Sequence, residues 1–422
     1  MFLKKSTLLT PTASPHLFRR TTCRLCDASE LELVLKLTPT PAADAYLHEK
    51  KNQEAYPMDL YLCRECGHAQ LLDVVDPAVS FGDYIYVTSS SPGLVEHFRR
   101  YASDVMRHLD MPKNSSVLDI GSNDGTLLKF FKEHGMNIIG VDPARAIAEE
   151  ATQNGLPTLV SFFTSDLARN LLRERGPMKL ICANNAFAHS DDLADITDGV
   201  QCLLDQNGVF VFEASYLLDT IEGMVFDFIC NEHLSYHSVK PLQRFLSKHG
   251  LELFDIVRIP THGGSIRGFA QHAGGPRPVS TSVEAITNYE TKMGLDRLDI
   301  FKRYASQIEK GRIEVVKALK HLSKQGKVIA GYGASPTTTV LIYHFDLGHV
   351  LSFIVDDNQI KHNTFSPGHH IPVLSSEVIN ERKPDYIVIL AWRFAEMIMK
   401  RHAHYRAAGG KFIVPLPELK FV

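Results

Sequence analysis

The segment from Val117 to Leu128, which reads VLDIGSNDGTLL, constrains the fold more than any other stretch of the chain. Its apolar start indicates a buried strand that ends at Ile120. Gly121 and Gly125 then bracket a polar turn, and a following apolar run opens a helix. This order is typical of the first corner of a nucleotide-binding α/β domain, where a ligand lies against backbone N–H groups at a helix start. The segment therefore predicts a Rossmann-like domain with a ligand at this corner.

The residues of the turn indicate which nucleotide the corner holds. A dinucleotide site needs a glycine where pyrophosphate touches the backbone, and this chain has Asn123 there. An acidic, open turn after Asp119 suits a ligand with a cationic amino-acid tail and no phosphate, for which S-adenosylmethionine is the obvious candidate. Asp142 ends the next predicted strand at the position that hydrogen-bonds a ribose diol, although an ordinary βαβ unit with a tight turn is the alternative. The predicted cofactor-binding residues are Asp119, Gly121, Asn123, Gly125, Asp142, Phe163 and Asn185.

Composition limits the classes of protein that fit. A chain of 422 residues has room for two to four domains. Its net charge of −3 gives no electrostatic case for a nucleic-acid or acidic-membrane partner. No run of about 18 apolar residues and no signal-peptide core is present, so we expect a cytoplasmic protein. Residues 1–22 show little periodicity, and we expect them to be partly disordered.

Four of the seven cysteines fall in two Cys-x-x-Cys pairs, Cys23 with Cys26 and Cys63 with Cys66. Two such knuckles offer one metal ion four thiolates, and zinc prefers a closed tetrahedral set of this kind. A redox dithiol would need only one pair in a thioredoxin-like context. His68 could compete as a ligand, but four cysteines already complete the tetrahedron. We therefore predict structural zinc in an N-terminal domain.

Strands and helices alternate from Asp142 to Glu213, which predicts a parallel sheet with helices on both faces. Ligands of such sheets lie beyond the carboxyl ends of the strands, where Asn185, His189 and Glu213 fall. A lone His189 could equally cap a helix.

The pair Glu232 and His233 belongs to the densest acid/base grouping in the chain. A histidine near its reference pKa of about 6.5 is a natural proton acceptor at neutral pH, and a neighbouring carboxylate can orient it. A polar helix start with a capping glutamate is the alternative. Tyr84 falls in a segment before the cofactor corner that we expect to be extended, where a tyrosine is more often packing than chemistry.

A second strand–glycine–helix corner begins at Lys327, after a Gly/Pro/Ser-rich linker and a helical region broken near Gly294. Backbone and hydroxyl donors at this corner form a good anion cradle, so a phosphate ligand fits here. The predicted domains are residues 1–80, 81–275 and 276–422.

Taken in order, these segments resemble the sugar C-methyltransferase family, whose members methylate a ring carbon of a nucleotide-bound keto sugar. The resemblance covers nearly the whole chain after residue 20. It rests on the four cysteines, the turn 119–125, Asn185–His189, Glu232-His233, His262–Ser265, Gly331–Ala334 and Pro367–Pro372. It implies a small zinc-binding domain, a central Rossmann-like class I methyltransferase domain and a C-terminal Rossmann-like α/β domain that binds the nucleotide sugar.

The resemblance also implies roles for single residues. His233 matches the general base, Glu232 its partner, Tyr84 a tyrosine near the substrate and His189 a second active-site histidine. The implied base removes the proton at C3 beside a C4 ketone, and the enolate carbon then takes the methyl group of S-adenosylmethionine, without zinc taking part. The implied substrate-binding residues are Gly331, Gly333, Ser335, Thr337, Asp356 and Arg393. We expect a monomer or homodimer with a small-molecule nucleotide-sugar substrate.

The chain departs from the family pattern at four places, one of which is Asn231, where the family often has histidine or aspartate. Cys230 stands where the family usually has tyrosine, Pro336 and Thr337 replace a usual lysine, and Arg393 replaces asparagine after Trp392. An arginine could bind a phosphate in place of that lysine. Two alternative functions therefore stay open: an NAD(P)-dependent oxidoreductase or epimerase, and a nucleotide-sugar-binding protein that has lost its chemistry.

Overall fold

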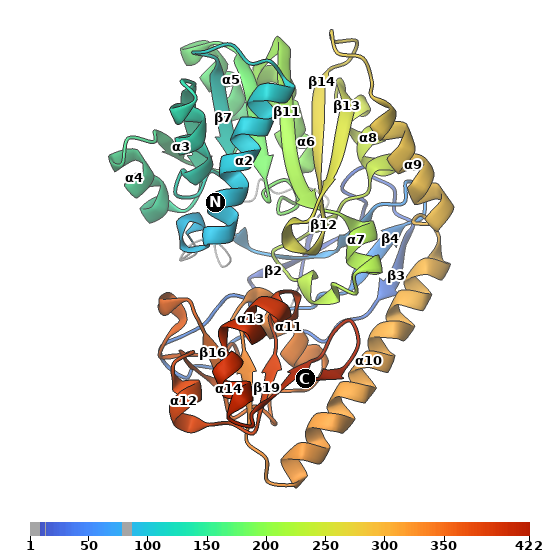
Figure 1. Ribbon diagram of the computed structural model, residues 1–422. Coiled ribbons are helices and arrows are strands. Elements are labelled where there is room, and N and C mark those ends of the chain that lie inside the picture. The colour runs from blue at the N-terminus through green and yellow to red at the C-terminus, as the bar shows by residue number, and fades with distance from the viewer. Residues whose placement is uncertain (1–8, 13, 78–86) are drawn as a thin grey trace.

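The computed structural model describes residues 9–12, 14–77 and 87–422. Figure 1 shows a central α/β sheet above, a second α/β sheet below and the N-terminal segment between them. The long helix α10 (Leu298–Lys324) runs along one side of the molecule and carries the chain from the upper to the lower sheet.

In the described residues, seven strands form the central sheet, in the order β13-β14-β11-β10-β7-β8-β9. Only β14 runs antiparallel to its neighbours, so the predicted parallel sheet is confirmed with one reversed strand near its edge. The strands are β7 (Ser116–Ile120), β8 (Asn137–Asp142), β9 (Thr158–Val160), β10 (Met178–Asn184), β11 (Leu204–Ser215), β13 (Leu251–Ile259) and β14 (Ser265–His272). The helices of this part are α2 (Pro92–His108), α3 (Thr126–Glu133), α4 (Arg145–Gln153), α5 (Ser165–Arg175), α6 (Leu193–Leu203), α7 (Leu217–Glu222) and α8 (Val239–Lys248).

Both faces of the central sheet are buried because alternate strand residues point to opposite sides. Val117, Leu180 and Val211 pack with residues of α2 and α3 in one apolar cluster. Leu118 and Ile181, their neighbours in sequence, belong to the larger cluster that continues into the other parts of the chain. A near-continuous apolar strand such as β10 is the sequence signature of this double burial.

The N-terminal part contains a sheet that borrows a strand from the central part. Its order is β12-β5-β4-β3, and β12 (Ser235–Tyr236) follows the Glu232–His233 pair in the chain. Ser235 pairs with Gln70 and Tyr236 with Ala69. The other strands are β3 (Leu31–Leu35), β4 (Leu60–Cys63) and β5 (Ala69–Leu71). The zinc-binding and central parts therefore share one hydrogen-bonded ladder.

Two short strands lie within residues 1–22, where the sequence shows little periodicity. β1 (Leu9–Pro11) and β2 (Leu17–Arg20) form an antiparallel sheet with β6 (Asp73–Val75), and Arg19 forms an ion pair with Asp73. Strands of three or four residues are too short for a visible period, so pairing partners decide their structure.

The C-terminal sheet has a parallel core with antiparallel strands at both edges, in the order β17-β18-β16-β15-β19-β20-β21. The strands are β15 (Ile329–Tyr332), β16 (Phe353–Asp356), β17 (Thr364–Phe365), β18 (Pro372–Ser375), β19 (Tyr386–Ile389), β20 (Lys411–Val414) and β21 (Lys420–Phe421). The helices are α9 (Thr281–Met293), α10, α11 (Pro336–His344), α12 (Val378–Arg382), α13 (Ala395–Arg401) and α14 (Ala403–Ala407). Gly294, with φ +73°, ends α9, so the predicted break in the helical region is confirmed.

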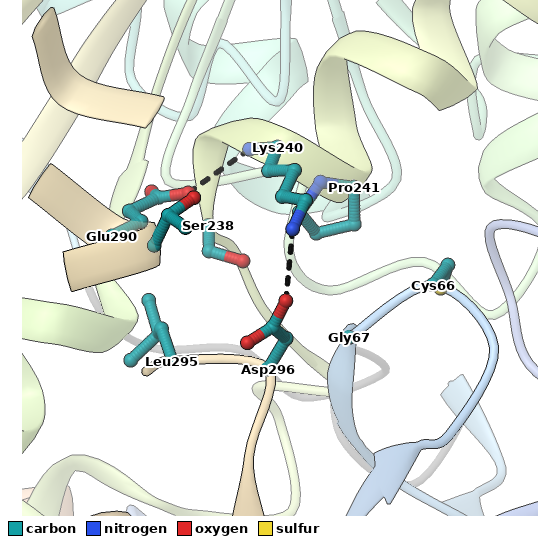
Figure 2. A pocket seen from close by; sticks show the side chains of 9 residues that line it. Cys66, Gly67, Ser238, Lys240, Pro241, Glu290, Leu295 and Asp296 are labelled. Carbon is teal, nitrogen blue, oxygen red and sulfur yellow. Dashed lines mark hydrogen bonds and ion pairs between the residues drawn. The ribbon is translucent and has the colours of Figure 1, made fainter. Parts of the chain in front are cut away.

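A small pocket lies where the second cysteine knuckle meets the turn between α9 and α10 (Figure 2). Glu290 of α9 accepts hydrogen bonds from the N–H groups of Val239 at 2.6 Å and Lys240 at 3.0 Å, and so caps the start of α8. Lys240 forms an ion pair with Asp296 at 2.8 Å. A Cβ on Gly67 would lie 3.0 Å from that of Asp296, so the knuckle packs closely on this turn.

The predicted boundary at 80/81 lies outside the described residues, and that at 275/276 falls between β14 and α9. Within the described residues, no helix combines the length and apolar character that crossing a membrane requires.

Candidate active site and zinc centre

The corner after β7 is built around two glycines in the left-handed region. Gly121 has φ +73° and Gly125 φ +74°, and a Cβ on Gly121 would lie 2.8 Å from the Cβ of Ala186. The N–H of Gly121 donates to the carbonyl of Val141 at 2.8 Å, which continues the β7–β8 ladder into the turn. Only glycine fits position 121 without both backbone strain and a clash.

The carboxyl group of Asp142 holds the turn together. It accepts the N–H of Asn123 at 2.8 Å and that of Ala144 at 2.9 Å, one on each oxygen. Each oxygen keeps a further lone pair, so the group can still accept from a ribose diol. Burial raises the pKa of Asp142, and burial together with Asp142 raises the pKa of Asp119 well above its ordinary value. The corner therefore fits a nucleoside that brings a positive charge.

The side chain of Asn123 anchors the segment that precedes α2. Its Oδ1 accepts the N–H of Thr88 at 2.9 Å and the hydroxyl of Thr88 at 3.2 Å. Asp124 accepts the N–H of Ser89 at 2.8 Å. Tyr84, four residues before Thr88, lies outside the described residues, so its predicted role near the substrate stays a prediction.

Three histidines meet at the edge of the sheet that carries this corner. His189 follows β10, His233 lies in the turn before β12, and His262 lies between β13 and β14. The rings of His189 and His233 are 4.6 Å apart, and the ring of Phe228 lies 4.6 Å from His233 and 5.6 Å from His262. His233 and His189, predicted from distant segments, are thus brought together.

The environment keeps these imidazoles neutral. Burial, together with His189 and His262, holds the pKa of His233 well below its ordinary value of 6.5. Burial and His262 lower the pKa of His189 to about 4, and burial and Arg393 lower that of His262 to about 4. Nδ1 of His233 is buried without a hydrogen-bond partner in the described part of the chain. A neutral ring with an open nitrogen can accept a proton.

The histidines and the glycine corner are connected by a short path of contacts. Asn185, with φ +53°, lies next to Ala186, which touches Gly121. Nδ2 of Asn185 lies 3.2 Å from Nε2 of His262, and its N–H donates to the carbonyl of Glu213 at 2.9 Å. The acid/base cluster and the predicted donor site therefore share one edge of the sheet.

Glu232, the predicted partner of His233, has charged neighbours elsewhere in the chain. The described residues include no hydrogen bond between the two side chains, and the charges near Glu232 come from other domains. Burial and Asp44 raise the pKa of Glu232 to about 7, and Lys361 opposes this rise. Lys361 itself forms an ion pair with Asp44 at 2.7 Å. Glu232 therefore lies where all three parts of the chain meet.

The second glycine corner repeats the geometry of the first. Gly333, with φ +106°, donates its N–H to Val355 at 2.8 Å, and its Cβ would lie 2.6 Å from that of Ala391. Asp356 accepts the N–H groups of Ala334 at 2.6 Å and Asn358 at 2.7 Å, as Asp142 does for its own corner.

Other predicted substrate residues also shape this second corner. Gly331 lies in β15, where a Cβ would come within 2.5 Å of Leu390. Ser335 caps α11, and its hydroxyl lies 3.0 Å from that of Thr337.

Arg393 forms its ion pair with a residue outside this corner. Its Nη1 is 3.3 Å from Asp227, and its guanidinium lies 5.7 Å from the ring of Phe228. A Cβ on Gly263 would lie 3.1 Å from Cδ of Arg393. Arg393 therefore reaches the histidine cluster, and its predicted phosphate contact stays a prediction.

Phe163, a predicted cofactor residue, is buried against α6. A Cβ on Gly199 of that helix would lie 3.0 Å from the Phe163 ring. The exposed fraction of Phe163 is 6%. In the structure, Phe163 therefore packs into the core beside α6.

The four predicted zinc ligands converge. The Sγ atoms of Cys23, Cys26, Cys63 and Cys66 all lie within 4.8 Å of one another. Cys23 and Cys66 are 3.6 Å apart at sulfur, as are Cys26 and Cys63. A tetrahedron with zinc–sulfur bonds of about 2.3 Å requires about 3.8 Å between sulfurs, so the set fits zinc. His68 instead lies 3.3 Å from the Ser235 hydroxyl and stacks on His237.

Sequence reasoning missed a buried charge network behind the site. Glu213 accepts from Nε of Arg267 at 2.6 Å and lies 2.7 Å from Nε2 of His97. Glu213 was predicted at a strand end, but His97 and Arg267 carry no local signal because their partners are distant in sequence. His262 belonged to a recognised segment, yet no role followed from it.

Comparisons with known proteins cover almost the whole chain. Residues 23–81 match a family model described as a zinc binding domain, residues 95–256 a methyltransferase domain, and residues 260–417 a C-methyltransferase C-terminal domain. The C-methyltransferase NovU of Streptomyces niveus is 31% identical over 404 residues, which span 95% of this chain and 96% of that protein.

Two solved structures are more distant. One is an S-adenosylmethionine-dependent methyltransferase from Clostridium acetobutylicum, with 14% identity, a TM-score of 0.34, and coverage of 46% of this chain and 95% of that chain. The other is magnesium protoporphyrin IX methyltransferase from Synechocystis, solved with bound SAH, with 14% identity, a TM-score of 0.33, and coverage of 42% and 83%.

Proposed function

Since this chain belongs to the C-methyltransferase family and is an S-adenosylmethionine-dependent enzyme, we propose that it methylates C3 of a nucleotide-linked 4-keto sugar. The observation that carries the proposal is the cluster of neutral histidines at the edge of the sheet that holds the donor corner. Such a cluster suits a reaction that begins with removal of a proton from carbon.

His233 acts as the general base in this proposal. It accepts the proton from C3, and the C–H electrons move into the enolate of the neighbouring ketone. When bound, S-adenosylmethionine would supply an electrophilic sulfonium methyl group, with S-adenosylhomocysteine as the leaving group. The enolate carbon forms the new C–C bond, and His233 leaves the step protonated. The low pKa of His233 keeps its ring unprotonated in the free protein, so that it can accept the proton. The imidazolium ion that forms is then stabilised by the negative charge that develops on the enolate oxygen nearby.

His189 is the proposed hydrogen-bond donor to the enolate oxygen. Its ring lies 4.6 Å from that of His233, so both could face one substrate carbon and its carbonyl neighbour. A donor aimed at a developing oxyanion in a dry site contributes about 3 kcal/mol to transition-state stabilisation. Tyr84 is the alternative donor.

The corner after β15 is the proposed nucleotide site. The start of α11 and the Ser335 hydroxyl offer hydrogen-bond donors to a phosphate. Arg393 of the same domain lies 3.3 Å from Asp227 on the side that faces the histidines. Its guanidinium is the proposed second contact of the diphosphate.

The test offers a panel of nucleoside-diphosphate 4-keto-6-deoxyhexoses with S-adenosylmethionine in deuterated water. We expect deuterium at C3 without donor and a methyl group at C3 with donor. His233→Asn should abolish both while S-adenosylhomocysteine still binds, and His134→Asn, an exposed histidine, serves as the control. Turnover retained in His233→Asn would reject the assigned base. Binding of NAD(P) in place of S-adenosylmethionine would instead support an oxidoreductase or epimerase.

A further inference from the structure

Arg24 lies between two zinc ligands, Cys23 and Cys26, yet its side chain has an exposed fraction of 0%. Arg64 holds the same place in the second knuckle and is exposed. Burial without partners is costly for a guanidinium, so its contacts indicate what the first knuckle is built to hold.

The guanidinium of Arg24 contacts two segments that come from the central domain. Nε donates to Oδ1 of Asp191 at 3.0 Å, and Nη2 lies 2.9 Å from the same oxygen. Nη1 donates to the carbonyl of Leu234 at 3.3 Å, to that of Leu71, and to Oε1 of Gln70 at 3.0 Å. One planar group thus fixes one side chain and one backbone carbonyl far apart in sequence.

Both segments carry a histidine of the site. Asp191 stands two residues after His189, and Leu234 directly follows His233. The carbonyl of Ala188 accepts the N–H groups of Leu234 at 3.0 Å and Ser235 at 3.1 Å, which joins the two segments beside Arg24. The separation of the two imidazoles is therefore set where these segments meet the knuckle.

Charge reinforces this contact. Arg20 forms a second ion pair with Asp191 at 3.0 Å and donates to the Asp191 carbonyl at 3.1 Å. Lysine cannot replace Arg24 here because an ammonium lacks the planar fork that reaches both segments.

We infer that Arg24 is a positioning residue, which transmits the geometry of the zinc knuckle to the segments that hold His189 and His233. The inference rests on the proposed roles of the two histidines. In this inference the metal centre affects the reaction through geometry alone. The four cysteines hold the first knuckle in place, and Arg24 in turn holds the segments that carry His189 and His233.

The experiment compares Arg24→Met and Arg24→Lys with the matched control Arg64→Met. Zinc content, amide hydrogen exchange of residues 186–192 and 230–236, and steady-state kinetics are measured on each full-length protein. In Arg24→Met we expect zinc to be retained and amide exchange in both segments to rise at least about tenfold, because their closed state loses an anchor. We expect kcat to fall about 100-fold with KM for S-adenosylmethionine unchanged, because misplaced catalytic groups lower the rate more than binding. The changes in exchange and kcat in Arg24→Lys should lie between those of Arg24→Met and the wild type. Arg64→Met should match the wild type.

Unchanged exchange in both segments of zinc-loaded Arg24→Met would overturn the inference. If that variant does not fold, Asp191→Asn, which removes the charge from the other partner, must raise exchange in the same segments, and its failure to do so has the same consequence. Amide exchange needs no substrate, so a wrong substrate class would appear separately as absence of turnover in the wild type.

Discussion

The indole N–H of Trp392 donates a 2.9 Å hydrogen bond to Asp227, whose side chain has an exposed fraction of 0%. This bond crosses from the C-terminal domain to the central one, and Arg393 adds an ion pair to the same carboxyl group. Phe228, the next residue, packs against the rings of His233 and His262. The position of the C-terminal domain and the wall of the histidine cluster are therefore connected through one buried carboxylate.

Asp227→Asn tests this connection. The variant keeps an acceptor for Trp392 but loses the charge that pairs with Arg393, which should cost about 2 kcal/mol of stability. For domains of this size we expect a fall of about 4–8 °C in the melting temperature, measured by calorimetry. Glu309→Gln breaks an exposed pair with Arg312 and should change the melting temperature by less than about 2 °C. Equal effects of the two substitutions would contradict the importance of the buried contact.

Gly121→Ala and Gly333→Ala form a matched pair that assigns the two corners. Each glycine has positive φ, and each added Cβ would lie within 3 Å of another Cβ. The left-handed conformation alone costs alanine about 1–2 kcal/mol, so the affinity of the ligand held by each corner should fall about tenfold or more. Calorimetric titration should find that Gly121→Ala weakens S-adenosylhomocysteine alone and Gly333→Ala weakens a nucleoside diphosphate alone. Loss of both ligands in either variant would argue against separate sites.

Glu232→Gln tests the raised pKa of that residue through stability. The folded-state pKa of about 7 exceeds the ordinary value of 4.5, because burial and Asp44 disfavour the charged form. The stabilisation that comes with the protonated carboxyl group is present below pH 4.5 and is lost as pH rises through 7. Relative to the wild type, Glu232→Gln should gain on the order of 3 kcal/mol between pH 4.5 and 7. Chemical denaturation across that range measures it, with the exposed Glu418→Gln as the control. A pH-independent difference would place the pKa near its ordinary value.

Cys63→Ser should remove the zinc ion and destabilise the protein. Structural zinc sites contribute directly to folding, so loss of one ligand should lower the first unfolding transition by on the order of 10 °C. Metal analysis should find one zinc ion per chain in the wild type and in Cys202→Ser, a cysteine of α6 outside the cluster. Zinc retained at full occupancy in Cys63→Ser would exclude it as a ligand.

The sequence was informative wherever the signal is local. The alternation of strands and helices from Asp142 to Glu213 was predicted and is observed, and Gly294 was expected to interrupt the helices around it. The cysteine spacing predicted a cluster that the sulfur positions now fit. Strand, turn and helix at each glycine corner follow from residues within a dozen positions of each other, so no distant contact was needed.

Relationships between the three domains could not be predicted in this way. The partnership of Glu232 with His233, expected from their adjacency and from the family resemblance, stays a prediction, and no local pattern indicated that Asp44 and Lys361 are charged neighbours of Glu232. Arg393 was assigned to a phosphate because of its motif, and here its carboxylate partner is Asp227, 166 residues away. Such partners depend on how separately folded sheets meet, which no local pattern encodes.

The ladder between Ser235 and Gln70 has a consequence for protein engineering. A gene fragment cut at the boundary near residue 81 would leave the β12 backbone without its neighbour and β5 with an open edge, and both halves would become prone to aggregation. Exchange of the zinc module between homologues would therefore need residues 235 and 236 to travel with it. The natural unit of recombination in this enzyme is discontinuous along the gene.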